Sequence, residues 1–427
     1  MAELFIAADD FTGALDTGVK LAQQGIGVRV VSGVDNVDSC AETVLVANLD
    51  TRHVSRDEAY HRTLFACQDA LRMGVRCIYI KTDSGLRGNI GAALEAAARA
   101  VNGTVVFVPA YPALNRRTED GIVMIGDVPV TQSVFGRDPL NPVRHDSILD
   151  IIAEQTSLDV SLNNEGGADI PPYIAIEELN TDEEMLYYAN VVGQIYEKKR
   201  DFADKHRVLG HILRRMNEKT RIKAYAGCAG FASVLNMLLG LKASKLRQAG
   251  IQLPLVVLSA SLSQINFDQM RAGEQCGLMS YVFYDILLPE PDFEALVSCV
   301  LENQTSALIE SAKTREDADE LSHRGEEVGL DAAARANRIA VNMGRAAKQL
   351  VDAGFQGTLC LFGGDILSAA LRSLQCEALT PLTEIEPGVV LSRAVLPGRE
   401  ITIVTKSGSF GSPDVIQKLM QYAEENQ

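Results

Sequence analysis

The chain has 427 residues, of which 47% are hydrophobic, and its formal net charge is −16. This length predicts two or three domains, and the acidic balance argues against nucleic acid or an anionic membrane as the main partner. No apolar run approaches the roughly 20 residues that a membrane helix needs, and the first residues lack the basic region and long apolar core of a signal peptide. We therefore expect a cytoplasmic protein that meets any anionic substrate with a local positive site.

The eight cysteines form no CxxC pair and no cluster with histidines at zinc spacing. Several lie in apolar, strand-like runs, where a free cysteine behaves as a small hydrophobic residue. The sequence therefore predicts a reducing compartment, no disulfide framework and no protein-held metal centre.

The first apolar run, residues 4–8, predicts a buried strand that ends in Asp9 and Asp10. A helix is expected over residues 14–24 and a second strand over residues 28–32, and this order predicts a parallel sheet. Two adjacent carboxylates at a strand end can accept hydrogen bonds from sugar hydroxyls, act as a base or cap the helix. We expect one of them to cap the helix and the other, Asp10, to face the ligand.

Arg52 follows the next predicted strand, residues 43–48. Loops at the carboxyl ends of parallel strands meet at one edge of a sheet, so Arg52 is expected near the two aspartates. Arginine makes planar, two-pronged contacts with carboxylates, which makes Arg52 a natural anchor for an acid group. An ordinary surface arginine is the alternative interpretation.

The chain is organised around residues 81–94, which lie between a predicted strand at 76–80 and a predicted helix at 90–100. This loop combines two cations, a carboxyl group and hydroxyls with glycines, in the residues Lys81, Thr82, Asp83, Ser84 and Arg87. Cations, a hydroxyl and flexible backbone at a helix start suit a small anion. The alternative is a strand–helix turn whose charges are merely solvated.

Residues 111–141 follow a predicted strand at 104–109 and show no regular periodicity. Long irregular segments in compact domains are usually functional, so we expect this one to wrap the site or a subunit contact. Residues 181–223 are highly charged and predict solvated helices. A domain boundary is expected soon afterwards, which gives an N-terminal domain of residues 1–245 and a C-terminal domain of residues 246–427.

In the second half, predicted strands at 255–258, 357–362 and 400–405 each run into a loop of serines or glycines. Two glycines at a helix start let backbone N–H groups approach a phosphate, although neither a Walker A motif nor a GxGxxG fingerprint is present. We expect the three loops to converge at one sheet edge. Further strands are expected at 281–288 and 306–311, and a long amphipathic helix at 332–354.

Four motifs occur together in this order: Ala8-Asp9-Asp10-Phe11-Thr12-Gly13-Ala14, Lys81-Thr-Asp-Ser-Gly-Leu-Arg-Gly-Asn-Ile-Gly91, Gly363-Gly364-Asp365 and Lys406-Ser-Gly-Ser-Phe-Gly411. With Gly126-Asp-Val-Pro-Val130 and Asp138-Pro139 between them, this set resembles the four-carbon acid sugar kinase family over nearly the whole chain. The resemblance implies transfer of the ATP γ-phosphate to the terminal hydroxyl of threonate, erythronate or 3-oxo-tetronate. The fold it implies is α/β, with two domains that each have a mostly parallel sheet flanked by helices, and a ligand site in the cleft between them.

Carried over by position, the resemblance implies two sets of binding residues. The acid sugar would be bound in the N-terminal domain by Asp10, Arg52, Lys81, Thr82, Asp83 and Ser84. ATP would be bound in the C-terminal domain by Ser261, Gly363, Gly364, Asp365, Ile366 and Gly408. The chain departs from the family pattern at Ala260, where glycine is usual, and at Ile366, where threonine is common.

Phosphoryl transfer depends on positioning and charge neutralisation more than on covalent chemistry. Lys81, Arg52 or Arg87 would hold the carboxylate, and Mg²⁺ would bridge the phosphates of ATP. Asp10 and Asp365 are both candidates for the carboxylate that orients or deprotonates the attacking hydroxyl. The sequence leaves open the choice between them, the stereoisomer of the substrate and the oligomeric state, for which a homodimer is one option.

The residues bear on two other interpretations of the chain. A phosphatase with an Asp-x-Asp motif does not fit, because Phe11 and Thr12 stand two residues after Asp9 and Asp10. A non-catalytic acid-sugar sensor derived from a kinase is supported only by the Ile366 departure. Titration with ATP separates these, since a pure acid-sugar binder ignores nucleotide.

Overall fold

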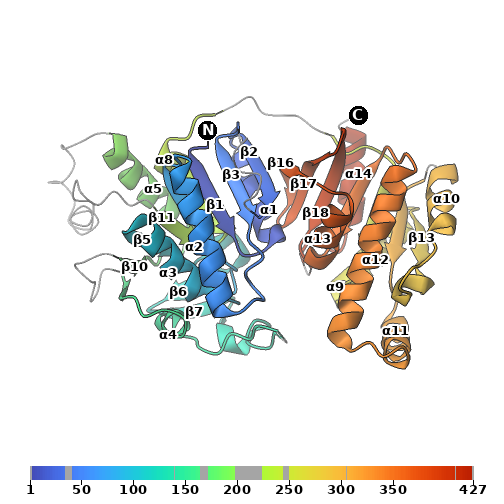
Figure 1. Ribbon diagram of the computed structural model, residues 1–427, viewed down its shortest axis with the longest axis horizontal. Helices are drawn as coiled ribbons and strands as arrows, with labels where there is room; N and C mark the ends of the chain where they lie inside the picture. The colour runs from blue at the N-terminus through green and yellow to red at the C-terminus, as the bar shows by residue number, and fades with distance from the viewer. Residues whose placement is uncertain are drawn as a thin grey trace. The chain divides into compact units, whose positions relative to one another are not determined.

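A computed structural model describes residues 2–33, 41–138, 140–163, 172–197, 224–243, 250–303, 305–408 and 410–425 (Figure 1). The chain divides into two compact units, Met1–Leu246 and Arg247–Gln427. The division lies one residue after the expected boundary. The predicted charged helices beyond residue 197, as well as Pro139 and Ser409 of the quoted motifs, lie outside the described residues.

The described part of the N-terminal unit is built on one sheet whose strand pairs are all parallel. Its strands run in the order β2-β3-β1-β4-β11-β5-β10-β9. Their bounds are β1 Leu4–Ala8, β2 Val28–Ser32, β3 Val44–Asn48, β4 Cys77–Lys81, β5 Thr104–Val108, β9 Val160–Leu162, β10 Tyr173–Ile176 and β11 Ala224–Gly227. Every residue of β1, β3 and β4 is buried, which explains why these strands are continuous apolar runs rather than alternating ones.

Helices connect these strands, as the sequence predicts. They are α1 Phe11–Ala22, α2 Arg56–Arg72, α3 Ile90–Val101, α4 Ile148–Ala153, α5 Asp182–Glu197, α7 Ala229–Ala232 and α8 Leu235–Leu239. Helices α2 and α3 lie side by side and pack against the central strands (Figure 1). Helix α1 begins at Phe11, three residues earlier than predicted, and this earlier start determines which aspartate caps it.

The segment after β5 is more regular than the sequence suggested. It contains a small antiparallel sheet of β6 Arg116–Glu119, β7 Ile122–Ile125 and β8 Val128–Pro129, flanked by the 3₁₀ turns η2 Pro112–Leu114 and η3 Val130–Gln132. Asp120 and Gly121, which join β6 to β7, both have positive φ, at 50° and 81°. This is the pattern of a tight two-residue hairpin turn, so the expectation of an irregular segment was wrong.

Within the C-terminal unit, the strands run in the order β13-β14-β12-β15-β18-β17-β16. The pairs from β13 to β18 are parallel, whereas β18, β17 and β16 form an antiparallel meander. The bounds are β12 Leu255–Ser259, β13 Met279–Val282, β14 Ala307–Glu310, β15 Thr358–Phe362, β16 Ala378–Glu386, β17 Val389–Leu396 and β18 Arg399–Lys406. The predicted strand at 281–288 is wrong beyond Val282, because Tyr284–Leu287 form a 3₁₀ turn, η4.

The helices of this unit are α9 Gln264–Gln275, α10 Glu294–Asn303, α11 Arg315–Glu327, α12 Ala332–Asp352, α13 Gly364–Ser373 and α14 Val415–Glu425. As predicted, Asp331 caps the long helix α12 by accepting a hydrogen bond from the Ala334 N–H at 2.7 Å. An added Cβ at Gly344 would lie 2.6 Å from the Ala369 carbonyl carbon, so glycine lets α12 pack closely against α13.

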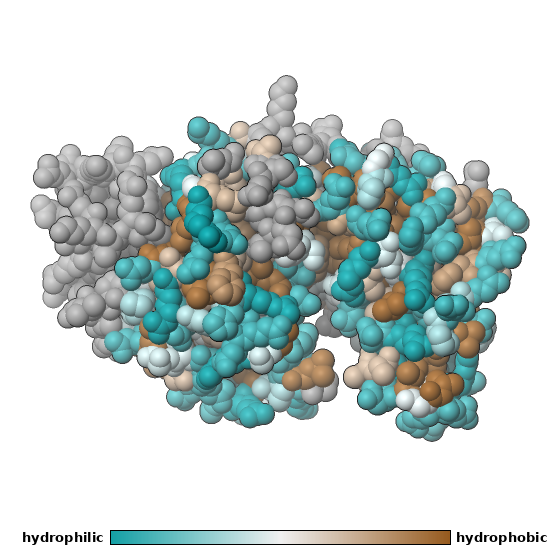
Figure 2. All heavy atoms as spheres, in the orientation of Figure 1, coloured by the Kyte–Doolittle hydropathy of each residue, from teal (hydrophilic) through white to brown (hydrophobic). Residues whose placement is uncertain are grey.

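Within the described ranges, no helix is long and apolar enough to cross a membrane. The seven described cysteines are free, and Cys67, Cys77, Cys228 and Cys360 are buried. Hydrophilic side chains cover much of the visible face of each unit (Figure 2).

Candidate functional site

In the N-terminal unit, three strands end side by side at the carboxyl edge of the sheet. Ala8, the last residue of β1, is in register with Asn48 of β3 and with Lys81 of β4. Lys81 ends β4 itself, and the loops after these strands carry Asp9, Arg52 and residues 82–87. The structure therefore confirms that these loops meet at one edge.

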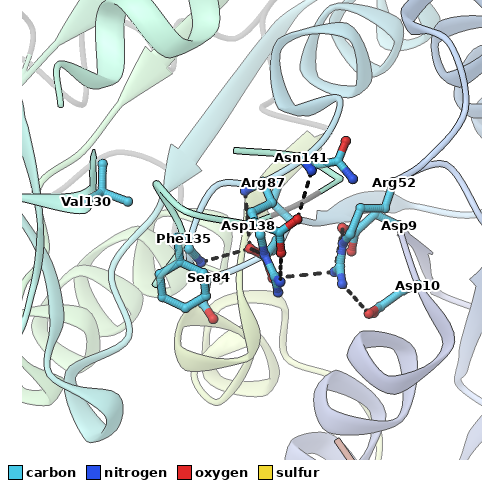
Figure 3. A network of polar contacts seen from close by, with 12 residues as sticks. Asp9, Asp10, Arg52, Ser84, Arg87, Val130, Phe135, Asp138 and Asn141 are labelled. Atoms are coloured by element: carbon cyan, nitrogen blue, oxygen red, sulfur yellow. Dashed lines mark hydrogen bonds and ion pairs between the residues drawn. The ribbon is translucent and has the colours of Figure 1, made fainter. Parts of the chain in front are cut away.

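Arg52 lies at the centre of this cluster and is only 9% exposed. Its Nε donates to Asp9 Oδ2 at 2.8 Å, its Nη1 donates to Asp10 Oδ2 at 2.5 Å, and its Nη2 lies 3.5 Å from Asp83 Oδ1 (Figure 3). Burial alone would lower the pKa of Arg52, but the three carboxylates raise that pKa well above its ordinary value. Arg52 thus neutralises carboxylates of the protein itself, which differs from the open anchor that the sequence suggested.

The division of labour between the two aspartates also differs from the prediction. Asp10 caps α1, because its Oδ1 accepts a hydrogen bond from the Gly13 N–H at 2.6 Å, and its Oδ2 accepts one from the Thr12 hydroxyl at 3.0 Å. Burial would raise the pKa of Asp10, yet Arg52, Lys81 and the Gly13 N–H together lower it. The expectation that Asp10 faces the ligand while its neighbour caps the helix was therefore wrong about the cap.

Of the two aspartates, Asp9 accepts fewer hydrogen bonds. Burial and the neighbouring carboxylates of Asp10 and Asp83 raise its pKa, against the opposing effect of Arg52. Among the residues that the structure describes, neither Asp9 Oδ1 nor the Thr82 hydroxyl oxygen has a hydrogen-bond partner, and both atoms are buried. Buried polar atoms are nearly always hydrogen-bonded, so two unpartnered oxygens at one sheet edge indicate a place for ligand hydroxyls.

Lys81 lies beside these oxygens and is buried. Its Nζ donates to the Thr82 carbonyl at 2.7 Å and lies 4.0 Å from Asp9 Oδ1. An added Cβ at Gly13 would lie 2.6 Å from both Lys81 Nζ and Asp10 Oδ1. Glycine at this position therefore leaves room for the ammonium group to reach the aspartates.

Asp83 organises its own loop rather than pointing to an open space. It accepts hydrogen bonds from the Gly85 and Arg87 N–H groups at 3.1 and 3.2 Å, and its two oxygens accept from Arg87 Nε and Nη2 at 2.9 Å each. Burial would raise the pKa of Asp83, but Arg52 and Arg87 hold it far below its ordinary value. Asp83 is thus a permanent anion that fixes the loop.

Residues of the segment after β5 contact this loop, and Phe135 and Asp138 lie beside Ser84 and Arg87 (Figure 3). Arg87 Nη1 donates to Asp138 Oδ2 at 2.9 Å, and Arg116 Nη1 donates to Ser84 Oγ. The guanidinium carbons of Arg87 and Arg116 lie 5.1 and 4.8 Å from the centre of the Phe135 ring. The sequence analysis quoted Asp138 only as part of a motif and did not single out Arg116 or Phe135, because nothing local distinguishes these two from other charges and rings in a loop.

In the C-terminal unit, a second set of loops converges. Ser259 of β12 is in register with Phe362 of β15, and Phe362 is in register with Lys406 of β18. The loops with Ser261, Gly363 and Gly408 therefore start at one sheet edge, which confirms the predicted convergence.

Gly363 stands at the start of α13 with φ 111° and ψ 140°, a conformation that side-chain-bearing residues rarely adopt. Apart from its own chain neighbours, no atom of the described residues lies within 4 Å of the place where its Cβ would be. Asp365 in the first turn is exposed, whereas Ile366 is buried at 4% exposure and faces the core. Any contact of Ile366 with a ligand would therefore go through its backbone.

Two further groups line this edge. Lys406 is buried over the Phe362 ring, its Nζ donates to the Gly408 carbonyl at 2.7 Å, and burial lowers its pKa to about 8. Glu310 ends β14, next to β12, and burial raises its pKa to about 7. Its Oε1 accepts a hydrogen bond from Ser280 at 3.0 Å, while its buried Oε2 has no partner within the part of the chain that the structure describes. Sequence reasoning did not identify Glu310.

Among the residues that the structure describes, no three His, Cys, Asp or Glu side chains form a group that could hold a metal ion. A Mg²⁺ ion that arrives with a nucleotide needs fewer protein ligands, since it is usually held by one or two carboxylates together with phosphates and waters. The exposed carboxylate of Asp365, beside the two glycines, fits that smaller requirement.

Comparison with known proteins gives two family matches. A model described as a sugar-binding N-terminal domain matches residues 4–180, and one described as a nucleotide-binding C-terminal domain matches residues 256–416. The D-threonate kinase of Salmonella typhimurium is 26% identical over 439 residues, which cover 99% of each chain. The 3-oxo-tetronate kinase of Pectobacterium atrosepticum is 24% identical over 440 residues, which cover 97% of each chain.

The fold also matches a solved structure. The crystal structure of a Haemophilus influenzae protein superposes with a TM-score of 0.73 and 20% identity, covering 98% of this chain and 100% of that one. At this identity the likeness bears on the fold alone. It agrees with the α/β architecture of the two units.

Proposed function

The chain belongs to the four-carbon acid sugar kinase family, and we propose that it is an ATP-dependent kinase that phosphorylates the terminal (C4) hydroxyl of a four-carbon acid sugar. The substrate class comprises D-threonate, D-erythronate and 3-oxo-tetronate. One observation carries the proposal. The unit matched to sugar binding has unpartnered Asp9 and Thr82 oxygens at its sheet edge, while the unit matched to nucleotide binding has a glycine-lined helix start at its own sheet edge.

On the sugar side, the proposal gives the polar atoms distinct roles. Asp9 Oδ1 and the Thr82 hydroxyl would bond the sugar hydroxyls, with Lys81 close enough to share in that contact. Asp9 joins Asp10 as a candidate base, because its pKa is raised whereas that of Asp10 is lowered. A base works best when its pKa approaches the working pH, which favours Asp9 of the two.

On the nucleotide side, the first N–H groups of α13 point toward the start of the helix, where Gly363 leaves the backbone open to a phosphate. Ser261 and Gly408 would add contacts from the neighbouring loops. Mg²⁺ bound with the nucleotide would neutralise phosphate charge. Asp365 would either hold this ion or, as expected from the sequence, orient or deprotonate the attacking hydroxyl of the sugar.

In the proposed reaction, the terminal hydroxyl oxygen bonds to the γ-phosphorus while the bond to the bridging oxygen of ADP breaks. The hydroxyl proton passes to the carboxylate that orients it. The reaction requires the two bound substrates to meet, and the expected cleft between the domains stays a prediction, as do the cytoplasmic location and a homodimer.

The test is coupled ATP turnover in the presence of Mg²⁺ against D-threonate, L-threonate, D-erythronate and 3-oxo-tetronate. Turnover of one of them, with a phosphorylated product, supports the proposal and names the substrate. Binding of an acid sugar without any nucleotide binding would overturn the kinase assignment and leave a sensor.

A further inference from the structure

Helix α9 carries two buried amide side chains that reach two of the loops expected to bind the nucleotide. Asn266 and Gln269 lie three residues apart, on one face of the helix, and are 2% and 0% exposed. Burying an amide costs free energy unless it is hydrogen-bonded. The partners of these two side chains therefore show what the helix holds.

Asn266 fixes the loop after β12. Its Oδ1 accepts a hydrogen bond from the Ser259 hydroxyl at 2.8 Å, and its Nδ2 donates to the Ser261 carbonyl at 2.9 Å. Ser259 is the last residue of β12, so one side chain ties the loop that carries Ser261 to the end of its own strand.

Gln269 fixes the loop after β18, which is distant in the sequence. Its Nε2 lies 3.1 Å from each of the carbonyl oxygens of Phe410, Gly411 and Ser412. All three partners are acceptors, so the amide must turn its nitrogen toward them. Helix α9 therefore holds this loop and the Ser261 loop at a set distance from each other.

This contact also sets the direction of a backbone donor. A trans peptide unit holds its C=O and N–H on opposite sides, so drawing the Phe410 carbonyl to Gln269 turns the Gly411 N–H away from α9. Gly411 has φ 85°, and an added Cβ would lie 3.2 Å from Gln269 Nε2 and 3.0 Å from Glu386 Oε1. Glu386 also accepts from the Ser412 N–H at 2.8 Å, which holds the next residue.

The helix itself is firmly seated. Met270 is 2% exposed and belongs to the same core cluster as Val404 of β18. An added Cβ at Gly273 would lie 3.0 Å from Ile416 Cδ1 and 3.2 Å from Leu308 Cδ1, so α9 packs closely against both α14 and β14. Side chains that project from such a helix have a fixed base from which to hold loops.

From these contacts, and resting on the proposed function, we infer that Asn266 and Gln269 are positioning residues for ATP. They hold the Ser261 loop and residues 410–412 in one preformed arrangement, and Gln269 turns the Gly411 N–H toward a phosphate of the nucleotide. Backbone N–H groups presented in this way bind phosphates well. Loops that are already in place spare ATP the cost of ordering them.

The test compares the wild type with Gln269→Met, which keeps the length of the side chain but not its donors. The control is Gln275→Met, the same change at an exposed residue in the last turn of α9. Binding of ATP and D-threonate is measured by calorimetry, and turnover gives KM and kcat. We expect Gln269→Met to bind ATP about 10- to 30-fold more weakly, with a raised KM for ATP, a kcat within about twofold and an unchanged affinity for D-threonate. Gln275→Met should match the wild type.

Hydrogen exchange separates positioning from general damage. Without ATP, the peptide with Phe410, Gly411 and Ser412 should exchange faster in Gln269→Met than in the wild type, whereas the peptide with Gly363 and Gly364 should not change. Asn266→Asp keeps the acceptor for Ser259 but loses the donor to Ser261, and it should weaken ATP binding about 5- to 10-fold.

A folded Gln269→Met with wild-type affinity for ATP would overturn the inference, and so would equal losses of affinity for ATP and D-threonate. If this variant fails to fold, Gln269→Asn gives the answer, since it keeps a buried amide with a shorter reach; unchanged ATP binding there would overturn the inference. These results leave the proposed function standing. A wild type that binds no ATP would overturn both.

Discussion

Replacing Gly85 with alanine tests the packing that connects the loop after β4 to the segment above it. The new Cβ would lie 2.5 Å from Cδ1 and Cγ of Phe135 and 2.7 Å from Cε1, roughly 1 Å closer than ordinary carbon contacts. Gly85 is buried, and its φ lies outside the left-handed region, so the backbone itself tolerates alanine. The ring must therefore move.

Overpacking of this kind typically costs about 1–3 kcal/mol, and the lower entropy of the unfolded alanine chain offsets about 0.4–1 kcal/mol. We expect Gly85→Ala to lower the free energy of unfolding in urea by about 1–2 kcal/mol. Because a displaced Phe135 would disturb the packing of Arg87 and of the loop that carries Lys81 and Thr82, the affinity for the acid sugar should fall at least tenfold while the affinity for ATP is unchanged.

The control is Gly103→Ala, since the nearest atom to an added Cβ there is 3.4 Å away, an ordinary contact. The double variant Gly85→Ala/Phe135→Leu should recover part of the lost stability, because the smaller side chain vacates the space. If Gly85→Ala matches the wild type in both stability and acid-sugar affinity, Phe135 does not occupy the position on which this reasoning rests.

Three further perturbations address other parts of the account. Arg52→Gln leaves three carboxylates without their central cation, so urea unfolding at pH 7 should show a loss of about 3–5 kcal/mol, and an unchanged stability would contradict its central role. Burial raises the pKa of Glu310 to about 7, so the contribution of Glu310 to the free energy of unfolding should fall as the pH rises from about 4.5 through 7. Glu310→Gln should not show this fall. At pH 8 the variant should be more stable than the wild type by at most about 3 kcal/mol in urea unfolding. Lys406→Met frees the Gly408 carbonyl and should weaken ATP binding in calorimetry without changing acid-sugar binding, and equal losses of both would contradict its assignment to the nucleotide unit.

Much of the architecture follows from local sequence. Apolar runs separated by helical patterns predict parallel strands, and parallel strands bring their carboxyl-end loops to one edge. This reasoning places residues 9–10, Arg52 and residues 81–87 together, and it also brings together the loops with Ser261, Gly363 and Gly408. This prediction needs only the order of strands and helices along the chain, which the spacing of apolar residues indicates.

Details that depend on one residue of register were harder to predict. Helix α1 starts at Phe11 instead of Ala14, so the cap falls on Asp10, although both aspartates are good caps. The strands β6, β7 and β8 are four residues long or shorter, which is too short for a periodic signal. Their only clue was the Asp120-Gly121 pair, which is a hairpin turn signal.

Charge pairing was beyond sequence reasoning for a different reason. Whether Arg52 faces a ligand or the protein depends on carboxylates that lie 31 to 43 residues away in the chain, and only the folded arrangement brings them within contact. For the same reason Arg116 and Phe135 could not be distinguished from the other side chains of their segment. Ile366 is the opposite case, since its neighbours Leu367 and Ala370 already indicate a helix face turned to the core.

The most direct measurement of the central claim is the position of the transferred phosphate. The purified chain is incubated with ATP, Mg²⁺ and each four-carbon acid in turn, and the product is examined by phosphorus and carbon NMR. The account predicts ADP together with one acid sugar that carries a single phosphate on its terminal C4 oxygen, in equal amounts. ATP hydrolysis without a phosphorylated sugar, or no turnover with any of the acids, would contradict it.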